Sequence, residues 1–370
     1  MLSLLLCFLV AITGQGQAGS DEEKSLAELR KAPQEAKELE KWFYDSLRTH
    51  AKDREKVSQL NDEYRSKNKE LESRYRPLIF KHAKDAAAFE AIVALNGMIP
   101  LDDQILDIIR QYHISNPGMV KLLNTLSQNG GAQQKLINEV ALKHPDKKVR
   151  AEVLFGLARM DRIYLLDGVK PQPSFGGRLG TPEVLRKRAT ERLNRVIADY
   201  ADLKNEEGVS YLDLAQDQLA GVNNVGRLVV GKPAIDVEGI DLEGKPLKLT
   251  TGNGTVTMLV FWGTWCGPCM RLVPREVALS EKYQGQPFKI FGVNGGDEQK
   301  KALESARAKK MTWPSFFIGP HGDGLGAVWG VSAWPTVFVI DHQGIIRYIG
   351  HGDGMEKAVE ECMEKVKSSK

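Results

Sequence analysis

The sequence predicts a two-domain protein, in which an all-helical segment is followed by an α/β sandwich with a mixed sheet. Three observations lead to this prediction. Helical patterns run from Asp21 to about Gly221 without a strand-rich block. Over residues 220–255, glycines and β-branched residues replace the long charged segments. Strand and helix patterns then alternate and end with a hairpin and a last helix, which is typical of a layered α/β domain with strands in both directions.

Length and composition agree with two soluble domains. The chain has 370 residues, more than one typical domain. Its hydrophobic fraction of 42% and charged fraction of 27% are ordinary for a globular protein with a substantial core. The formal net charge of +3 is small for this length, so composition gives no support for a nucleic-acid partner or another polyanion.

The amino terminus has the pattern of a secretory signal peptide. Residues 2–12 are almost wholly apolar, and small residues at 16–18 lie where signal peptidase would cut. The apolar run is well short of the roughly 20 residues of a membrane-spanning helix. No Lys or Arg precedes it, so an uncleaved anchor or a buried helix stays open. We expect residues 1–18 to direct export to the periplasm or another extracytoplasmic space, with membrane anchoring if the signal is not cleaved.

Residues 19–224 are predicted to form the helical domain. The charge-dense stretch 22–76 predicts one or two long surface helices, and Pro77 is expected to start or kink a helix, not to lie within one. Further helices are predicted at Ala86–Met98, Gly118–Leu126, Gln133–Lys143, Lys147–Met160 and Pro182–Leu203. Residues 144–160 are similar to a HEAT repeat helix and residues 192–204 to a tetratricopeptide helix. Neither recurs at a fixed period, so an irregular bundle stays open. Either version offers a surface for an unknown protein partner.

Residues 225–370 are predicted to form the α/β domain, with a β-hairpin extension at its start. "DLEG" before "KPLKL" predicts that hairpin. The apolar run at Val256–Trp262 has strand length and predicts the central strand. The expected order beyond it is helix 266–283, strand 288–293, helix 298–310, strand 315–318, strand 336–340, a turn at "DHQG", strand 345–349 and helix 355–367.

The four cysteines do not form a disulfide scaffold, because an exported protein held by disulfides would carry a larger, even set in its mature chain. Cys7 lies in the expected signal segment. Cys362 belongs to an apolar stripe at helical spacing, which predicts a buried small hydrophobic residue. The sequence "WCGPC" at 265–269 is the one place where two cysteines, Cys266 and Cys269, stand close together.

Cys266 and Cys269 are predicted to form a redox pair. A strand that leads into Cys-x-x-Cys at a helix start places Cys266 where unpaired N–H groups and the helix dipole favour a thiolate. Such a position lowers the thiol pKa from about 8.5 to roughly 3.5–7.5. Pro268 suits the first helical turn. A zinc site would need two more Cys or His at matching spacing, which the sequence lacks, so we expect no metal. Inert packing of both cysteines is the remaining alternative.

Residues 225–366 resemble thioredoxin-fold thiol–disulfide oxidoreductases, and specifically the exported TlpA/ResA-like group, which is related to redoxin/AhpC-TSA proteins. The resemblance is carried by "VGKPAIDVEGIDLEGKPLKL" (230–249), "FWGTWCGPCM" (261–270) and "WGVSAWPTVFVIDHQGIIRYIG" (329–350). It implies a cis proline that precedes the penultimate strand and faces the disulfide. Trp313-Pro314 competes with Trp334-Pro335 for this place, and Pro335 fits it because "TVFVID" follows directly. Pro274 matches a helix kink of the family.

The resemblance also implies a mechanism with no cofactor beyond the redox-active disulfide of Cys266 and Cys269. Cys266 would attack a partner-protein disulfide as the thiolate, and Cys269 would resolve the mixed disulfide and release the partner reduced. Five residues would form the groove for the substrate chain: Trp265, Gly267, Pro268, Trp334 and Pro335. The Gly-Pro dipeptide favours a reductant, which a membrane electron donor would have to recharge. An oxidase or isomerase role stays open.

The sequence departs from the family where an acid usually handles the proton of the second thiol. Thioredoxins carry a buried acid six residues before the first cysteine, where this chain has Val260. Many TlpA/ResA-like members carry a Glu three residues after the second cysteine, where this chain has Leu272. Glu276 lies one turn further along, without a sequence signal for its direction. Deprotonation of Cys269 is therefore expected to be slow or water-assisted, with weaker turnover below neutral pH than in an acid-bearing relative.

Two other functions stay open at this point. The start of the α/β domain also resembles peroxiredoxins, but these place Thr or Ser three residues before the reactive cysteine, where this chain has Gly263. The chain could instead be a non-catalytic interaction protein with a thioredoxin-like docking module. The intact "WCGPC" together with Pro335 argues against that alternative. The glycine-rich stretch 319–326 lacks the strand-to-helix placement of a nucleotide-binding loop and is predicted to be a flexible connection.

Overall fold

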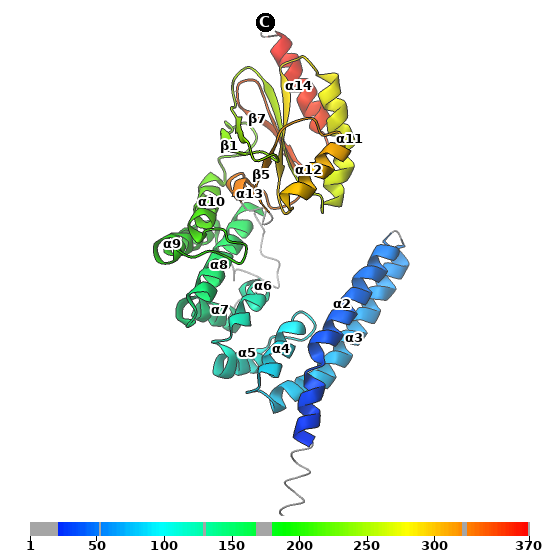
Figure 1. The fold of residues 1–370 in the computed structure, drawn as a ribbon, viewed down its shortest axis with the longest axis vertical. Coiled ribbons are helices and arrows are strands. Elements are labelled where there is room, and N and C mark those ends of the chain that lie inside the picture. The colour runs from blue at the N-terminus through cyan, green and yellow to red at the C-terminus, as the bar shows by residue number, and fades with distance from the viewer. Residues whose placement is uncertain (1–20, 52, 129–130, 168–179, 320–323, 369–370) are drawn as a thin grey trace, which may run out of the picture. The chain divides into compact units, whose positions relative to one another are not determined.

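The structure, a computed structural model, describes residues 21–51, 53–128, 131–167, 180–319 and 324–368 of the chain. They form two compact units, which divide between Val153 and Leu154 (Figure 1). The expected signal peptide, residues 1–18, lies outside the described residues. Among the helices of the described ranges, none combines the length and the apolar composition that a membrane crossing requires.

The described elements of the first unit are helices. They are residues 21–29, α2 (Ala32–Thr49), α3 (Arg54–Lys81), α4 (Ala86–Ala94), α5 (Asp103–Ile108), the π-helix η1 (Ile109–His113), the 3₁₀-helix η2 (Pro117–Leu122), α6 (Leu123–Gln128) and α7 (Ala132–Lys143). The α3, α4 and α5 helices begin at aspartate caps that accept hydrogen bonds from backbone N–H groups of the first turn. The α2 and α3 helices lie side by side (Figure 1), and Phe43 of α2 stacks on Tyr64 of α3 with 4.1 Å between ring centroids.

The expectation that Pro77 does not lie within a helix is wrong. The α3 helix continues through Pro77 to Lys81. Proline removes one backbone donor and crowds the preceding turn. However, Tyr75 and Ile79 on either side of it are fully buried. The packing of these two side chains outweighs the single hydrogen bond that the proline removes.

The second unit begins with the last helices of the helical segment. The α8 helix (Lys147–Asp167) crosses the division between the units, and α9 (Pro182–Tyr200) and α10 (Tyr211–Asn224) follow it. The α10 helix packs against α9 and against α13 (Gly324–Val328). Gly221 permits this close approach, because an added Cβ would lie 2.3 Å from the carbonyl oxygen of Ala327. The domain limits 19–224 and 225–370 stay a prediction from composition. The contacts between α10 and α13 cross the predicted limit.

A five-stranded mixed sheet forms the centre of the second unit. Its strands are β3 (Val256–Trp262), β4 (Phe288–Asn294), β5 (Ser315–Phe317), β6 (Thr336–Ile340) and β7 (Ile346–Gly350), in the spatial order β5-β4-β3-β6-β7. The β3, β4 and β5 strands run parallel, whereas β6 and β7 pair antiparallel with their neighbours. A separate hairpin of β1 (Val237–Ile240) and β2 (Pro246–Leu249) precedes the sheet.

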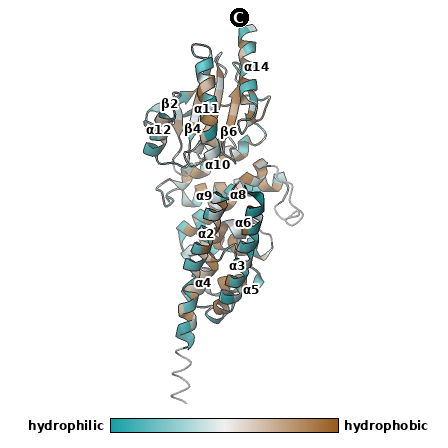
Figure 2. Cartoon of the chain, turned by 90° about the vertical axis from the view of Figure 1, so that its right-hand side faces the viewer, coloured by the Kyte–Doolittle hydropathy of each residue, from teal (hydrophilic) through white to brown (hydrophobic). Residues whose placement is uncertain are grey.

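The two faces of the sheet are covered by different elements. On one face, α11 (Gly267–Lys282), α12 (Gln299–Ala308) and α14 (Met355–Ser368) share a core with alternate β3 residues such as Met258. On the other face, Leu259 packs with Val237 of the hairpin and Trp329 beside α13. The β3 strand is therefore buried along its whole length, as expected for a strand covered on both faces. Figure 2 shows the same layering, with apolar strands β4 and β6 and a largely hydrophilic α12.

The predicted fold class is confirmed, an all-helical segment followed by a thioredoxin-like mixed sheet with helices. The strands predicted at 256–262 and 336–340 have these bounds in the structure, and the other predicted elements of the α/β domain differ by one or two residues at their ends. The prediction of a flexible connection at 319–326 is wrong at its end, because α13 begins at Gly324. Residues 320–323 lie outside the described ranges.

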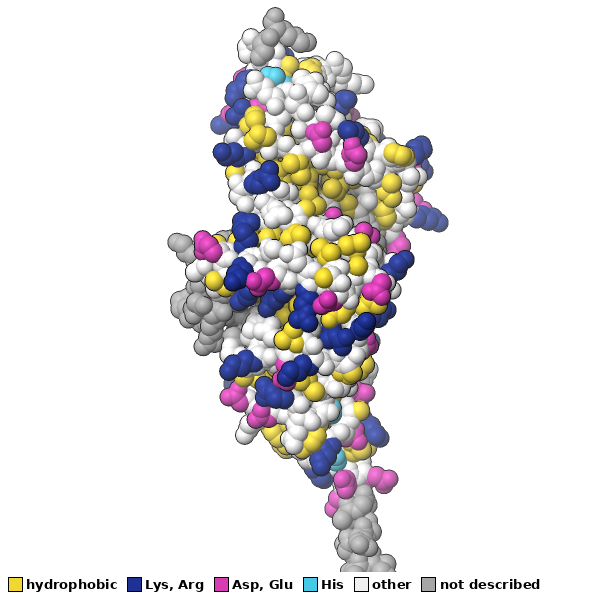
Figure 3. Space-filling view, turned by 90° about the vertical axis from the view of Figure 1, so that its left-hand side faces the viewer, with side chains coloured by type: hydrophobic (Ala, Val, Ile, Leu, Met, Phe, Trp, Pro, Cys, Tyr) yellow, Lys and Arg dark blue, Asp and Glu magenta, His cyan; other side chains and the backbone are white. Residues whose placement is uncertain are grey.

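Charges on the surface are mixed. On the face drawn in Figure 3, basic and acidic side chains lie among one another. Elsewhere on the described surface, opposite charges pair between α11 and α14, as Lys282 does with Glu360 and Arg275 with Glu356. This arrangement agrees with the small net charge of the chain.

Candidate active site

Cys266 caps the helix that follows the central strand. The β3 strand ends at Trp262 and α11 begins at Gly267, so Cys266 is the N-cap residue of α11, with φ −87° and ψ 96°. Its Sγ accepts a hydrogen bond from the N–H of Cys269, 3.1 Å away. Pro268 lies in the first turn, where its missing N–H leaves no helical bond unmade. The remaining N–H groups and the dipole of this helix end favour negative charge on the Cys266 sulfur.

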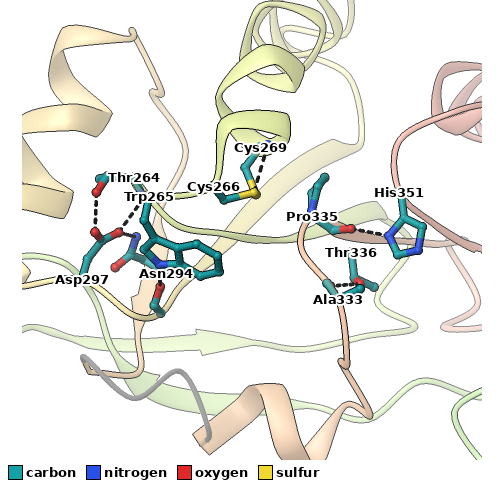
Figure 4. The surroundings of a disulfide bond; sticks show 11 residues. Thr264, Trp265, Cys266, Cys269, Asn294, Asp297, Ala333, Pro335, Thr336 and His351 are labelled. Atoms are coloured by element: carbon teal, nitrogen blue, oxygen red, sulfur yellow. Dashed lines mark hydrogen bonds between the residues drawn. A yellow bond between two sulfur atoms is a disulfide. The ribbon is translucent and has the colours of Figure 1, made fainter. Parts of the chain in front are cut away.

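Cys266 and Cys269 are joined by a disulfide, with their Cα atoms 5.2 Å apart (Figure 4). Both residues are almost completely buried, with exposed fractions of 4% and 2%. Gly267 and Pro268 between them are exposed, and Trp265 before them is 54% exposed. A partner molecule therefore meets Trp265 and the Gly-Pro turn before it reaches the sulfur atoms.

The loop that enters β6 faces the disulfide. The peptide bond between Trp334 and Pro335 is cis, and Pro335 is buried beside the disulfide (Figure 4). Two hydrogen bonds hold the loop. Thr336 Oγ1 donates to the carbonyl of Ala333, 2.7 Å away, and His351 Nδ1 lies 2.6 Å from the carbonyl of Pro335. Because a carbonyl oxygen only accepts, Nδ1 is the ring nitrogen that carries the proton there.

Trp265 is seated against a second loop. Its Nε1 donates to the carbonyl of Gly295, 3.0 Å away, and its ring centroid lies 5.7 Å from that of Trp334. Two glycines leave room for the indole, because a Cβ added at Gly263 or at Gly296 would lie 2.5 Å from Nε1. The side of the indole that carries Nε1 thus lies against the backbone of both glycines, while the exposed part faces solvent beside the disulfide. The glycine at 263 is required by this seat.

A buried carboxylate joins the loops that follow β3 and β4. Asp297 Oδ2 accepts from the backbone N–H of Thr264 at 2.7 Å and from Nδ2 of Asn294 at 3.0 Å. Its Oδ1 accepts from Thr264 Oγ1 and lies 3.7 Å from Nζ of Lys301. The Asp297 side chain is fully buried, whereas that of Lys301 is mostly exposed. Figure 4 shows this group on the opposite side of the disulfide from Pro335 and His351.

The two positions where the family resemblance implies an acid are apolar and buried in this chain. Val260 and Leu272 have exposed fractions of 1% and 4%. The Leu272 side chain packs against Gly352, where an added Cβ would lie 2.6 Å from it. Neither position supplies a group that can accept a proton from Cys269.

Glu276 is the buried carboxyl of this helix, with an exposed fraction of 2%. Burial raises its pKa to about 8, and the charge of Arg275 only partly opposes that rise. Glu276 lies seven residues beyond Cys269, about 10 Å along the helix axis. The sequence analysis left open whether the Glu276 side chain points toward the core. The spacing from Cys269 through Val273 to Glu276 places the three residues on one helix face, and this spacing indicates a buried position.

Two further features that the sequence singled out, Cys362 and Trp313-Pro314, belong to other elements. Cys362 in α14 is buried at 2% exposure, and burial raises the pKa of its thiol to about 11, so its predicted packing role is confirmed. Trp313-Pro314 leads into β5, an edge strand two positions from β3. The structure therefore brings Pro335, and not Pro314, to the disulfide.

Sequence reasoning missed three residues of the site: Thr264, Asn294 and Asp297. A signal for them exists, because polar residues lie at the end of β4 and just after the ends of β3 and β4, which are adjacent and run parallel. The carboxyl ends of parallel strands meet at one edge of a sheet, where α/β domains place their sites. The pairing of β3 with β4 was needed to bring them together.

Part of this chain is similar to known proteins. Residues 230–349 match the AhpC/TSA family. The thiol-disulfide oxidoreductase ResA of Geobacillus thermodenitrificans is 33% identical over 140 residues, which cover 38% of this chain and 79% of that protein. ResA of Geobacillus kaustophilus is 31% identical over the same shares. Among solved structures, the thioredoxin domain of a thiol-disulfide oxidoreductase from Bacteroides vulgatus is 22% identical, with a TM-score of 0.33, and the match covers 36% of this chain and 98% of that one.

Proposed function

This chain belongs to the ResA-like thiol–disulfide oxidoreductases, and on that premise we propose that it is an exported reductant of disulfides in partner proteins. The observation that carries the proposal is the position of Cys266. It caps α11, is bonded to Cys269 and lies beside Pro335. This arrangement suits dithiol–disulfide exchange with no cofactor other than the disulfide itself.

The reaction starts from the reduced pair. The Cys266 thiolate attacks one sulfur of the partner's disulfide, the partner's S–S bond breaks, and one partner thiolate leaves. A mixed disulfide now joins Cys266 to the partner. The Cys269 thiolate then attacks Cys266 Sγ, which reforms the internal disulfide and releases the second partner thiolate. The partner gains two electrons and takes two protons, and the chain is left oxidised.

In this proposal, no neighbouring carboxylate accepts the thiol proton of Cys269. Val260 and Leu272 are apolar, and Glu276 is about two helical turns away. With a pKa of about 8, Glu276 is mostly uncharged at neutral pH. Water that enters beside Cys266 is therefore the acceptor, which makes the resolving step slower as the pH falls.

The partner chain is held by the aromatic rim and by a groove beyond it. Trp265 and Trp334 form the rim at the disulfide. The groove, with a volume of about 320 Å³, is lined by Thr336 and His351 from the Pro335 side, and by Leu166 of α8 and Asn224 of α10. This lining supports a role of the helical segment in choosing the protein partner.

The dipeptide between the cysteines supports the reductive direction of electron flow in this proposal. Gly267-Pro268 is the thioredoxin dipeptide, and thioredoxin has a potential of about −270 mV, against about −120 mV for the oxidant DsbA. A reductant outside the cytoplasm must be recharged, so the proposal includes a membrane electron donor.

A trapping experiment tests this function. The full chain with Cys269→Ser, expressed with its amino-terminal segment intact, is expected to accumulate partner proteins joined to Cys266 and released by dithiothreitol. The matched control is the same chain with Cys266→Ser as well. Equal capture by the control, or no capture by the single variant, contradicts the proposal. A potential of the wild-type pair near that of DsbA contradicts the reductive direction.

A further inference from the structure

We propose that Asp297 is a positioning residue for disulfide exchange, because its carboxylate fixes the turn that carries Trp265 and Cys266. The inference rests on the function proposed above. Asp297 touches neither sulfur. It acts through Trp265 and Cys266, the two residues that its turn holds in place.

The contacts of Asp297 connect two separate segments. One carboxylate oxygen accepts from the backbone N–H of Thr264, and the other from its hydroxyl. Thr264 is two residues before Cys266, on the loop after β3. Asp297 itself is on the loop after β4, and the side chain of Asn294, the last residue of β4, supplies a third donor. The carboxylate therefore holds the two loops at a fixed separation.

Trp265 depends on that separation. Its indole N–H donates to the carbonyl of Gly295, on the same loop as Asp297. The ring also fills the space that Gly263 and Gly296 leave open, one glycine from each loop. A shift of one loop relative to the other opens this seat and moves the exposed indole that a partner chain meets first.

A carboxylate suits this place better than a neutral side chain. Three donors converge on Asp297, and the side chain is fully buried. Hydrogen bonds to a charged acceptor are about twice as strong as neutral ones, and a buried donor left without a partner is expensive. Asparagine can keep its oxygen toward Thr264 N–H and Asn294, while its NH₂ group faces the Thr264 hydroxyl, which can accept. We therefore expect Asp297→Asn to keep most of the geometry and Asp297→Ala to lose it.

The domain offers a matched control at the other end of β6. Asp341 is also a buried aspartate that holds a loop, and it accepts from the backbone N–H groups of Gln343 and Ile345, each at 2.9 Å, and from Arg347 at 2.6 Å. It follows the end of β6 opposite to Pro335. Asp341→Ala removes a comparable set of hydrogen bonds without touching the site.

The experiment measures kcat/KM for reduction of insulin by the full chain, with dithiothreitol as electron donor and below the thermal midpoint of every variant. Misplacement of a reacting group by about 1 Å can lower a rate about a hundredfold. We expect Asp297→Ala to lower kcat/KM by about ten- to a hundredfold, Asp297→Asn to recover most of that loss, and Asp341→Ala to match the wild type. A kcat/KM for Asp297→Ala within twofold of wild type, or an equal loss in Asp341→Ala, overturns the proposal.

A double-mutant cycle separates positioning from a general structural role. Trp265→Phe removes the indole donor. If Asp297 acts through Trp265, the double variant loses no more activity than the worse single variant, whereas independent roles give multiplied losses. Hydrogen exchange of the Trp265 indole N–H is expected to quicken in Asp297→Ala and to stay unchanged in Asp341→Ala. Multiplied losses, or unchanged indole exchange in Asp297→Ala, overturn the proposal.

Two further outcomes are distinguishable. If Asp297→Ala does not fold, Thr264→Val takes its place, because it removes one donor with little change of shape. It must show a smaller loss of kcat/KM, and this loss must be non-additive with that of Trp265→Phe. Full activity of Thr264→Val would then count against the positioning role. If the folded wild-type chain does not reduce insulin at all, the proposed function fails, whatever Asp297 does.

Discussion

Glu276 lies on the same buried face of α11 as Cys269, two turns further along the helix, and each has an exposed fraction of 2%. A carboxyl in such a place stays protonated at neutral pH, because burial raises its pKa to about 8. The relationship has a consequence for stability as well as for proton transfer, since the unfolded chain releases this proton near pH 4.5.

Glu276→Gln is expected to change how stability depends on pH. Between about pH 5 and pH 8 the folded wild type keeps the proton that the unfolded chain has released, so its free energy of unfolding falls as the pH rises. The fall sums to several kcal/mol, on the order of 1.4 per unit of pKa difference. Gln stays uncharged, so the variant is expected to be as stable as the wild type near pH 5 and more stable at pH 8.5. Urea unfolding at four pH values measures this.

The control for Glu276→Gln is Glu281→Gln, on an exposed position of the same helix. The free energy of unfolding of Glu281→Gln is expected to stay close to that of the wild type at each pH. A stability difference for Glu276→Gln that does not change between pH 5.5 and pH 8.5 would show that the carboxyl is not held uncharged.

Trp265→Ala is expected to weaken binding of protein disulfides. Trp265 is 54% exposed beside buried sulfur atoms, and large aromatic side chains in such positions carry much of the binding energy of an interface. We expect KM for insulin to rise about tenfold, equivalent to about 1.4 kcal/mol, with little change in thermal stability. Tyr44→Ala is the matched control, because Tyr44 is 57% exposed on α2. Equal KM values for the two variants would contradict a binding role for Trp265.

Gly221→Ala is expected to loosen α10 from α13. The added Cβ would lie 2.3 Å from the Ala327 carbonyl, and overpacking of this kind lowers stability by about 1–3 kcal/mol. Gly326→Ala is the control, since the nearest atom to its added Cβ is 3.9 Å away. Urea unfolding measures both. A loss no larger in Gly221→Ala than in Gly326→Ala would show that the helices do not need this close approach.

Cys362 is expected to take no part in thiol–disulfide exchange. Its thiol is buried with a pKa of about 11, so it should resist alkylation at pH 8 in the folded chain and react only after unfolding. Cys362→Ala is expected to leave insulin reduction unchanged. Rapid alkylation of Cys362 in the native chain, detected by mass spectrometry, would contradict its burial.

The α/β domain was predictable because its signals are local. The apolar run of β3, the "DHQG" turn and the Gly-Pro turn between the cysteines each lie within a few residues. The Asp297 network was not predictable from local pattern, since it joins Thr264 to a residue on another loop through the pairing of β3 with β4. The prediction for Pro77 was wrong for a related reason. The helix continues because the neighbours of Pro77 are buried, and helix propensity does not describe burial.

The rate at which Cys266 reacts with iodoacetamide, followed against pH in the reduced full chain with Cys269→Ser, shows whether this thiol is ionised at neutral pH. Only the thiolate reacts, so the midpoint of the profile is the pKa of the Cys266 thiol. We expect a midpoint within roughly 3.5–7.5, as for a thiol at a helix N-terminus. A midpoint at or above about 8.5, that of an ordinary free thiol, would contradict it.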